Sequence, residues 1–172
     1  VTELPFENRR VGETRVPFSV IPSSAFEGKL TLRKVVFPPV VEIISRDAFR
    51  GCSNLVEVDF SLAGNLKRID KSVFLACNNI KKLDLSNCRE LECIEMNSFC
   101  ACANLQSVDL TGCEKLEEIG SNCFDNCYSL NEVTLSGCSS LKRINSEAFF
   151  RNNNLSSFDF ALLPMLEDIG SY

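Results

Sequence analysis

Apolar positions along this chain recur with a period of 25 residues. Five phenylalanines keep the register without slippage: Phe49, Phe74, Phe99, Phe124 and Phe149. Apolar residues follow each phenylalanine at the same offsets, illustrated in one repeat by Leu105, Val108, Leu110, Leu116 and Ile119. A fixed period between about 20 and 50 residues is typical of stacked repeats. The pattern therefore predicts a solenoid in which each repeat forms one coil.

Each repeat divides into segments with different patterns. A short turn or helix carries the phenylalanine, as in residues 45–52 or 145–150, with Ser45, Asp70 and Asn145 as candidate N-caps. Apolar and polar residues then alternate, which predicts half-buried strands at 57–60, 82–85, 107–110, 132–135 and 157–160. A polar turn and a short extended Leu-x-x-Ile segment complete the unit. Equivalent strands of successive repeats should lie parallel and about 4.8 Å apart.

The repeats predict one continuous, elongated domain, because a single repeat buries too little apolar surface to fold alone. Residues 1–25 are interpreted as a degenerate N-terminal repeat or cap, and residues 26–172 as the solenoid. Its units are anchored at Phe26, Phe49, Phe74, Phe99, Phe124 and Phe149. The chain ends inside a repeat, so we expect further repeats or a partner to cover this end.

The repeats resemble the BspA-like, or Treponema pallidum-type, leucine-rich repeat. The signature Ile-x-x-x-Ala-Phe-x-x-Cys-x-x-Leu-x-x-Val-x-Leu is met by Ile44, Ala48, Phe49, Cys52, Leu55, Val58 and, with Phe for the last Leu, Phe60. The last unit departs from it with Asn152 in place of cysteine. The resemblance implies a curved right-handed solenoid with parallel strands on the concave face and short helices, turns and extended segments elsewhere. It also implies protein recognition, often as a microbial cell-surface adhesin, and carries over no catalytic residues.

The charge distribution narrows the choice of partners. Residues 1–50 carry 8 basic and 6 acidic side chains, whereas residues 51–172 carry 10 and 17. An acidic body argues against nucleic acid, which needs a basic footprint. No apolar run is long enough to span a bilayer, so membrane insertion is not expected. A protein of unknown identity is therefore the expected partner.

The 10 cysteines mostly follow the repeat. Two columns contain Cys52, Cys77, Cys102 and Cys127, and Cys88, Cys113 and Cys138. We interpret them as small buried apolar side chains. Disulfides are disfavoured because stacked Cβ vectors run parallel, and zinc because there is no histidine and no paired C-x-x-C. Cys93, Cys100 and Cys123 lie off the columns, and of these three Cys93 should be the most exposed, but it lacks a base partner.

Polar side chains of the predicted strands form columns on one face. The candidate partner-binding residues are Glu57, Asp59, Lys82, Asp84, Ser107, Asp109, Glu132, Thr134 and Asp159. Neighbouring aspartates repel one another, which favours a cation or a basic partner. The alternative is a solvated face whose aspartates accept hydrogen bonds from nearby Ser and Lys. A further column of Asn54, Asn79, Asn104 and Asn154 should hydrogen-bond turn backbone.

The sequence predicts a non-catalytic protein–protein interaction module that binds through this polar, acidic face. The chain has no histidine, glycine-rich phosphate loop or convergent acid/base pair, so no enzyme, cofactor or metal is expected. The alternative is a structural scaffold within a larger intracellular assembly. The location stays open, since the family resemblance favours the cell surface and the thiol columns favour a reducing compartment.

Overall fold

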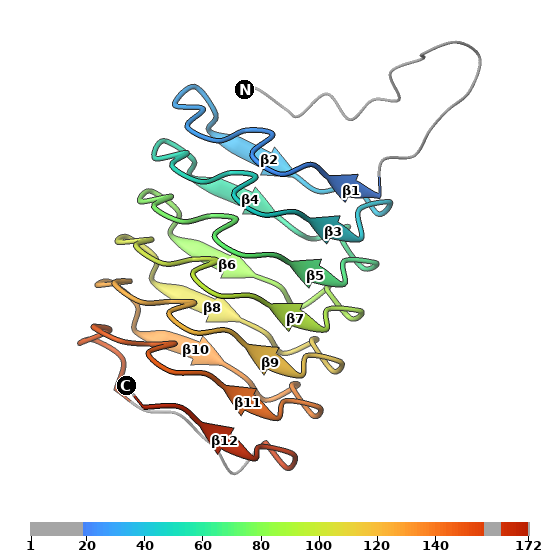
Figure 1. The fold of residues 1–172 in the computed structure, drawn as a ribbon, viewed down its shortest axis with the longest axis vertical. Coiled ribbons are helices and arrows are strands. Elements are labelled where there is room, and N and C mark those ends of the chain that lie inside the picture. The colour runs from blue at the N-terminus through green and yellow to red at the C-terminus, as the bar shows by residue number, and fades with distance from the viewer. Residues whose placement is uncertain (1–18, 157–162, 172) are drawn as a thin grey trace.

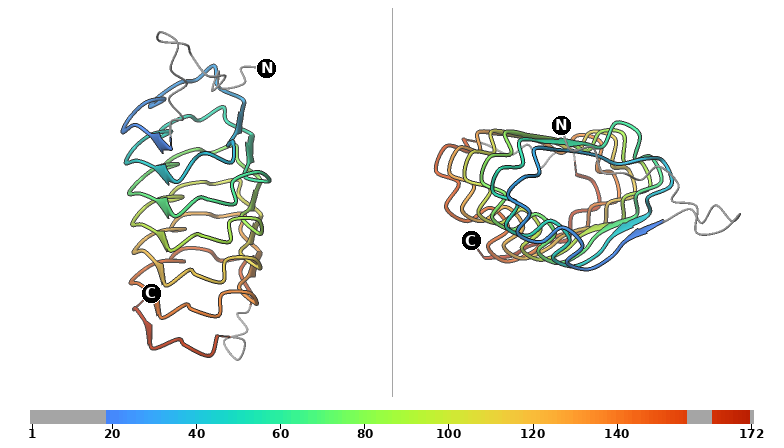
Figure 2. Two further views of the ribbon diagram at one scale, coloured as in Figure 1. Left: turned by 90° about the vertical axis from the view of Figure 1, so that its right-hand side faces the viewer. Right: turned by 90° about the horizontal axis from the view of Figure 1, so that it is seen from above.

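The protein is a solenoid of stacked coils (Figure 1). The structure, a computed structural model, describes residues 19–156 and 163–171. Seen along the stack, the coils superpose on one another (Figure 2). The described residues form strands and turns and contain no helix. The predicted leucine-rich-repeat solenoid is confirmed, and of the predicted alternatives for the phenylalanine segment, turns form.

One side of the stack is a continuous parallel sheet of two-residue strands. Its seven strands follow chain order: β1 (Val20–Ile21), β3 (Ile43–Ile44), β5 (Arg68–Ile69), β7 (Cys93–Ile94), β9 (Glu118–Ile119), β11 (Arg143–Ile144) and β12 (Asp168–Ile169). The isoleucine of each Leu-x-x-Ile segment pairs with its equivalent one repeat away, as Ile69 does with Ile94. This confirms the predicted extended segment. β1 already lies within residues 1–25, so the sheet begins inside the predicted cap.

The second side carries three-residue strands. They are β2 (Lys34–Val36), β4 (Glu57–Asp59), β6 (Lys82–Asp84), β8 (Ser107–Asp109) and β10 (Glu132–Thr134). The strands of 57–60, 82–85, 107–110 and 132–135 were predicted one residue too long, and the one at 157–160 lies outside the described residues. These strands form two separate sheets, β2–β4 and β6–β8–β10. The ladder is therefore interrupted between β4 and β6.

Left-handed backbone prevents a helix at each phenylalanine. The residues two before and two after it have positive φ, for example Asp47 at 58° and Gly51 at 67°. A right-handed helix needs consecutive residues at negative φ, so these two positions end any helical turn. The interpretation of Ser45, Asp70 and Asn145 as helix N-caps is therefore wrong, since no helix follows them.

The turns bond to neighbouring coils as well as within themselves. The Phe49 N–H donates to the Val73 carbonyl at 2.9 Å, and the Gly51 N–H donates to Leu75 at 2.8 Å. Such bonds satisfy backbone groups that would be buried without a partner. The turns thus add a third line of hydrogen bonds along the stack.

A column of phenylalanine rings forms the centre of the core. Rings from successive coils stack with centroids 5.1 to 5.4 Å apart and planes within 12° of parallel, from Phe26 to Phe149. Phe74, Phe99 and Phe124 are fully buried. The columns of leucine, isoleucine and cysteine join them in one apolar cluster. The buried core fixes which side of each strand faces out.

Candidate functional site

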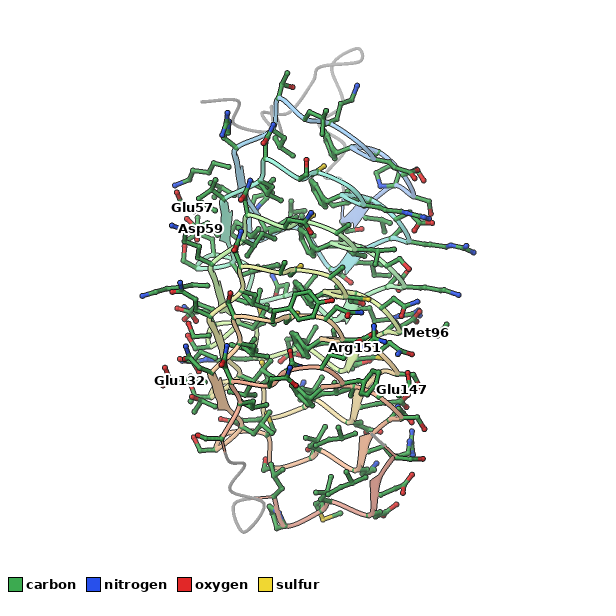
Figure 3. The ribbon with its side chains drawn as sticks, turned by 90° about the vertical axis from the view of Figure 1, so that its left-hand side faces the viewer. Glu57, Asp59, Met96, Glu132, Glu147 and Arg151 are labelled. Atoms are coloured by element: carbon green, nitrogen blue, oxygen red, sulfur yellow. The ribbon has the colours of Figure 1, made fainter. Side chains whose placement is uncertain are left out.

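The predicted binding residues lie together on the outer face of the three-residue strands. The middle residue of each strand points inward, as Val58, Leu83 and Val108 show with exposures of 6%, 1% and 1%. The flanking residues therefore face solvent. Glu57, Asp59 and Glu132 project from this side, and Met96 and Glu147 from the opposite side (Figure 3). Asp159 lies outside the described residues.

The aspartates of this face close the turns that follow their strands. Asp59 and Asp109 accept bonds from the backbone N–H two residues later at 2.9 Å, and Asp84 accepts from both the N–H and the hydroxyl of Ser86. This is the turn-forming habit of aspartate. The interpretation that the aspartates bond to nearby Ser is confirmed at Asp59 and Asp84. The hydroxyl and N–H of Ser61 hold the pKa of Asp59 below its usual value.

Charge is unevenly spread over the strand face. At the β2 end, Arg33 is exposed and Lys34 pairs with Glu57 at 2.5 Å. On β6 and just before it, Lys82 and Lys81 are exposed and form no ion pair with the described residues. The acidic character predicted for the whole face belongs mainly to the β8–β10 part.

Two basic residues of this face were not among the residues predicted from the sequence. Arg33 and Lys81 stand seven residues after their phenylalanines, one position before the strands begin. The offsets inside the strands, from which the candidate residues were predicted, are mostly acidic. Basic residues seven positions after a phenylalanine were the sequence signal that could have predicted this basic part of the face.

A groove opens where the ladder is interrupted. It has a volume of about 580 Å³ and lies between β4 and β6. Val56 and Phe60 contribute apolar surface, and Lys81, Lys82 and Gln106 line the other side. This concavity lies on the predicted binding face.

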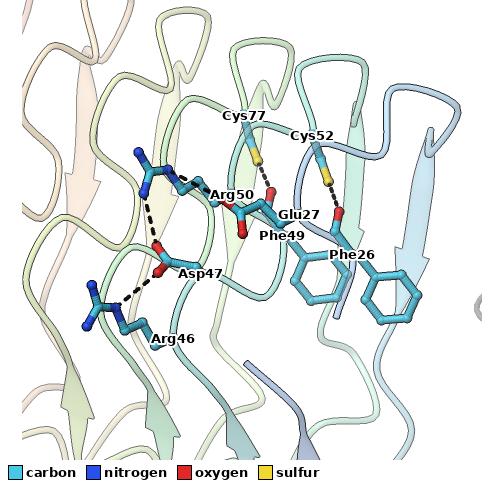
Figure 4. Close-up of polar contacts among 8 residues, drawn as sticks. All are labelled: Phe26, Glu27, Arg46, Asp47, Phe49, Arg50, Cys52 and Cys77. Atoms are coloured by element: carbon cyan, nitrogen blue, oxygen red, sulfur yellow. Dashed lines mark hydrogen bonds and ion pairs between the residues drawn. The ribbon is translucent and has the colours of Figure 1, made fainter. Parts of the chain in front are cut away.

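The cysteine columns are structural. Cys52 donates its S–H to the Phe26 carbonyl at 3.0 Å, and Cys77 to Phe49 at 3.2 Å (Figure 4). Cys102 and Cys127 make the same bond in the next two coils of this column. In the second column, Cys113 and Cys138 donate to the carbonyls of Leu85 and Leu110. All 10 thiols are free, and burial raises the pKa of Cys127 to about 12. The prediction of buried, unpaired thiols is confirmed for these columns.

The surroundings of Cys93 disfavour its thiolate form. It is half-buried, as is Cys100, whereas the other eight thiols are buried. Burial, together with Glu95 and Glu118, raises its pKa to about 11. A nucleophilic cysteine needs a lowered pKa. Among the described residues, no group of three or more His, Cys, Asp or Glu side chains could hold a metal ion.

The asparagine column connects coils. Asn54 donates to the Leu30 carbonyl, Asn79 to Ser53 and Asn154 to Tyr128, each at 2.8 Å. Asn104 bonds instead to the side-chain oxygen of Asn79 at 3.3 Å. The prediction of bonds to turn backbone is confirmed for the first three. These side chains therefore link successive coils of the stack.

Stacked coils with a polar, solvent-facing strand side define a leucine-rich-repeat protein. The chain belongs to the BspA type leucine rich repeat region family, whose model matches six copies over residues 19–156. Repeats of this kind form protein-interaction modules, and their solenoid fold is typically non-catalytic. Among the described residues, no helix has the length and apolar character needed to cross a membrane.

Solved structures support this assignment. The T. pallidum leucine rich repeat protein is 28% identical, with a TM-score of 0.70 over 79% of this chain and 60% of that one. A leucine rich cell surface protein from Faecalibacterium prausnitzii is 27% identical, with a TM-score of 0.67 over 81% of this chain and 36% of that one. The chain thus spans less than two thirds of either relative. No curated protein matches it.

Proposed function

We propose that this chain is a non-catalytic module that binds a protein partner through the outer face of β2, β4, β6, β8 and β10. The observation that supports this most is the part of the face formed by β6, β8 and β10, which pair as one parallel sheet. Its polar side chains stand on strands that are hydrogen-bonded in register, with Lys82 opposite Ser107 and Ser107 opposite Glu132. A preorganised surface loses little conformational entropy on binding.

We also propose a role in adhesion at a cell surface. The support is the Faecalibacterium prausnitzii relative, which is described as a cell surface protein. The exposed charges of the face suit a polar interface, in which complementary charge sets specificity and the rate of association. A scaffold inside a larger assembly is the competing function, and it would use other surfaces of the stack.

Affinity capture from the source cell tests the binding face. The immobilised wild-type chain is compared with Glu132→Lys and with Glu147→Lys. The two substitutions make the same charge change on opposite sides of the stack (Figure 3). We expect Glu132→Lys to lose the specific partner and Glu147→Lys to keep it. A partner kept by Glu132→Lys but lost by Glu147→Lys would contradict the proposed face.

A further inference from the structure

The interruption between β4 and β6 leaves main-chain groups without their usual partners. In the paired strands, the residue after the strand donates to the next coil: Leu85 to the Asp109 carbonyl at 2.8 Å and Leu110 to Thr134 at 3.0 Å. Within the described residues, no such bond joins Phe60 to Asp84. The Phe60 N–H and the Asp84 carbonyl therefore lack the bond that joins their equivalents in the paired coils.

The cysteine column shows the same opening independently. Cys113 and Cys138 donate to the carbonyls of Leu85 and Leu110 in the coil before. Cys88 is their equivalent, and the matching acceptor would be the Phe60 carbonyl. No bond of this kind is formed by Cys88 in the described part of the chain. Both the strand and the turn after it are thus separated from the coil above.

The turn after β6 differs at one residue from the turns after β8 and β10. Gly112 and Gly137 sit so close to the preceding coil that an added Cβ would lie 1.7 Å from the Ser86 oxygen and 1.4 Å from the Thr111 oxygen. The equivalent residue after β6 is Asn87, which carries a Cβ. The turn after β6 therefore cannot approach the Ser61 carbonyl as closely as its equivalents approach theirs.

The side chains around the opening favour an acidic ligand. Its carboxylates are already engaged: Glu57 with Lys34, Asp59 with the Ser61 N–H, and Asp84 with Ser86. Lys81 and Lys82 line the opening without an ion pair among the described residues. Ammonium groups are among the groups that carboxylates bind most strongly.

We propose that the groove between β4 and β6 docks an extended, acidic segment of a protein partner. Side chains of an extended segment alternate between two sides. Acidic residues of the segment pair with Lys81 and Lys82, and intervening apolar residues cover Val56, which is 43% exposed. This site rests on the proposed function and specifies the partner's chemistry for one part of the strand face.

Binding of a short, end-blocked peptide of alternating glutamate and valine tests the site. Fluorescence anisotropy compares the wild-type chain with three variants. Asn87→Gly closes the groove, Lys81→Ala with Lys82→Ala removes its cations, and Lys71→Ala removes a cation outside it. We expect both groove variants to weaken binding by about tenfold or more, the loss of one charged hydrogen bond. Lys71→Ala should bind like wild type.

Hydrogen exchange gives an independent reading of the groove itself. The Phe60 amide should exchange quickly in the wild type and slowly in Asn87→Gly, because the variant lets it bond to Asp84. Fast exchange in both would overturn the role of Asn87, and the lysine variant would then decide the site.

The docking proposal is overturned if the wild type does not bind the acidic peptide, if the lysine variant binds it equally well, or if a lysine–valine peptide binds better. The proposed function is judged separately, by the Glu132→Lys capture.

Discussion

At the scale of the residue, the side chain three positions after each phenylalanine donates a hydrogen bond to the backbone carbonyl of the phenylalanine in the preceding coil. In most coils the donor is a cysteine thiol, and in one it is an asparagine amide. Five coils place a donor at this position, and in the last of them Asn152 donates to the Phe124 carbonyl at 2.9 Å. Asn152 fits less well than cysteine, because its buried Oδ1 has no hydrogen-bond partner among the residues that the structure describes. An unsatisfied buried polar atom costs about 1–3 kcal/mol.

Asn152→Cys should therefore stabilise the protein by about 1 kcal/mol, a fraction of that penalty because a thiol donates weakly. The thiol replaces the bond to Phe124 and removes the orphaned oxygen. Urea denaturation under reducing conditions measures the change. Asn153→Cys is the matched control, since its side chain is exposed and should leave stability unaltered. A loss of stability in Asn152→Cys would show that the amide has a partner outside the described residues.

Asp59 makes stability depend on pH. The hydroxyl and N–H of Ser61 lower its pKa from the ordinary value of 3.8. A carboxyl with a lowered folded-state pKa contributes stability above its unfolded pKa, and the contribution disappears as the pH falls through the folded value. Asp59→Asn should therefore lose less stability than wild type when the pH drops from 5 to below about 3.8. Urea midpoints at both pH values check this, and equal losses in the two proteins would contradict it.

At the scale of the element, the sequence predicted the strands well and the turns incompletely. Alternation placed β4 and its equivalents to within one residue, because one buried position between two exposed ones is a strand signal. The phenylalanine segments were ambiguous. Their left-handed positions are filled not only by Gly51 and Asn126 but also by Ala76 and Ala101, which give no sequence signal for positive φ. Without that signal, a short helix and a pair of turns look alike.

Ala76→Gly and Ala101→Gly should each stabilise the protein by about 0.5–1 kcal/mol. Alanine at φ of 60° and 58° is strained by about 1–2 kcal/mol, and glycine is not, although glycine loses more backbone entropy on folding. Thermal and urea denaturation measure the gain. Ala103→Gly is the control, because this residue is outside the positive-φ set and should only lose stability. If all three variants lose stability alike, the strain at Ala76 and Ala101 is not significant.

At the scale of the molecule, periodicity predicts the stack but not its interruption. Every repeat from Phe49 onward has the same length, so the pattern predicts one uniform ladder of three-residue strands. The break between β4 and β6 coincides with Asn87, where the next two repeats have Gly112 and Gly137. The substitution of asparagine for glycine predicts no break by itself, because the close approach of the turns is visible only in the structure. The predicted binding residues stay a prediction, although their shared face follows directly from the two-residue period.

A cavity in the column of stacked rings should destabilise the middle of the solenoid. Phe99 is fully buried and stacks on Phe74 at 5.2 Å and on Phe124 at 5.4 Å. Phe99→Ala should therefore cost about 3–5 kcal/mol. Because coils contact mainly their neighbours, the loss falls on the two interfaces of one coil and leaves the others intact. Unfolding should then separate into two transitions, one for each end of the stack. Hydrogen exchange across a urea titration, with Leu62→Ala as the exposed control, resolves them. A single transition shifted uniformly over all coils would show that the stack unfolds as one cooperative unit even with its centre weakened.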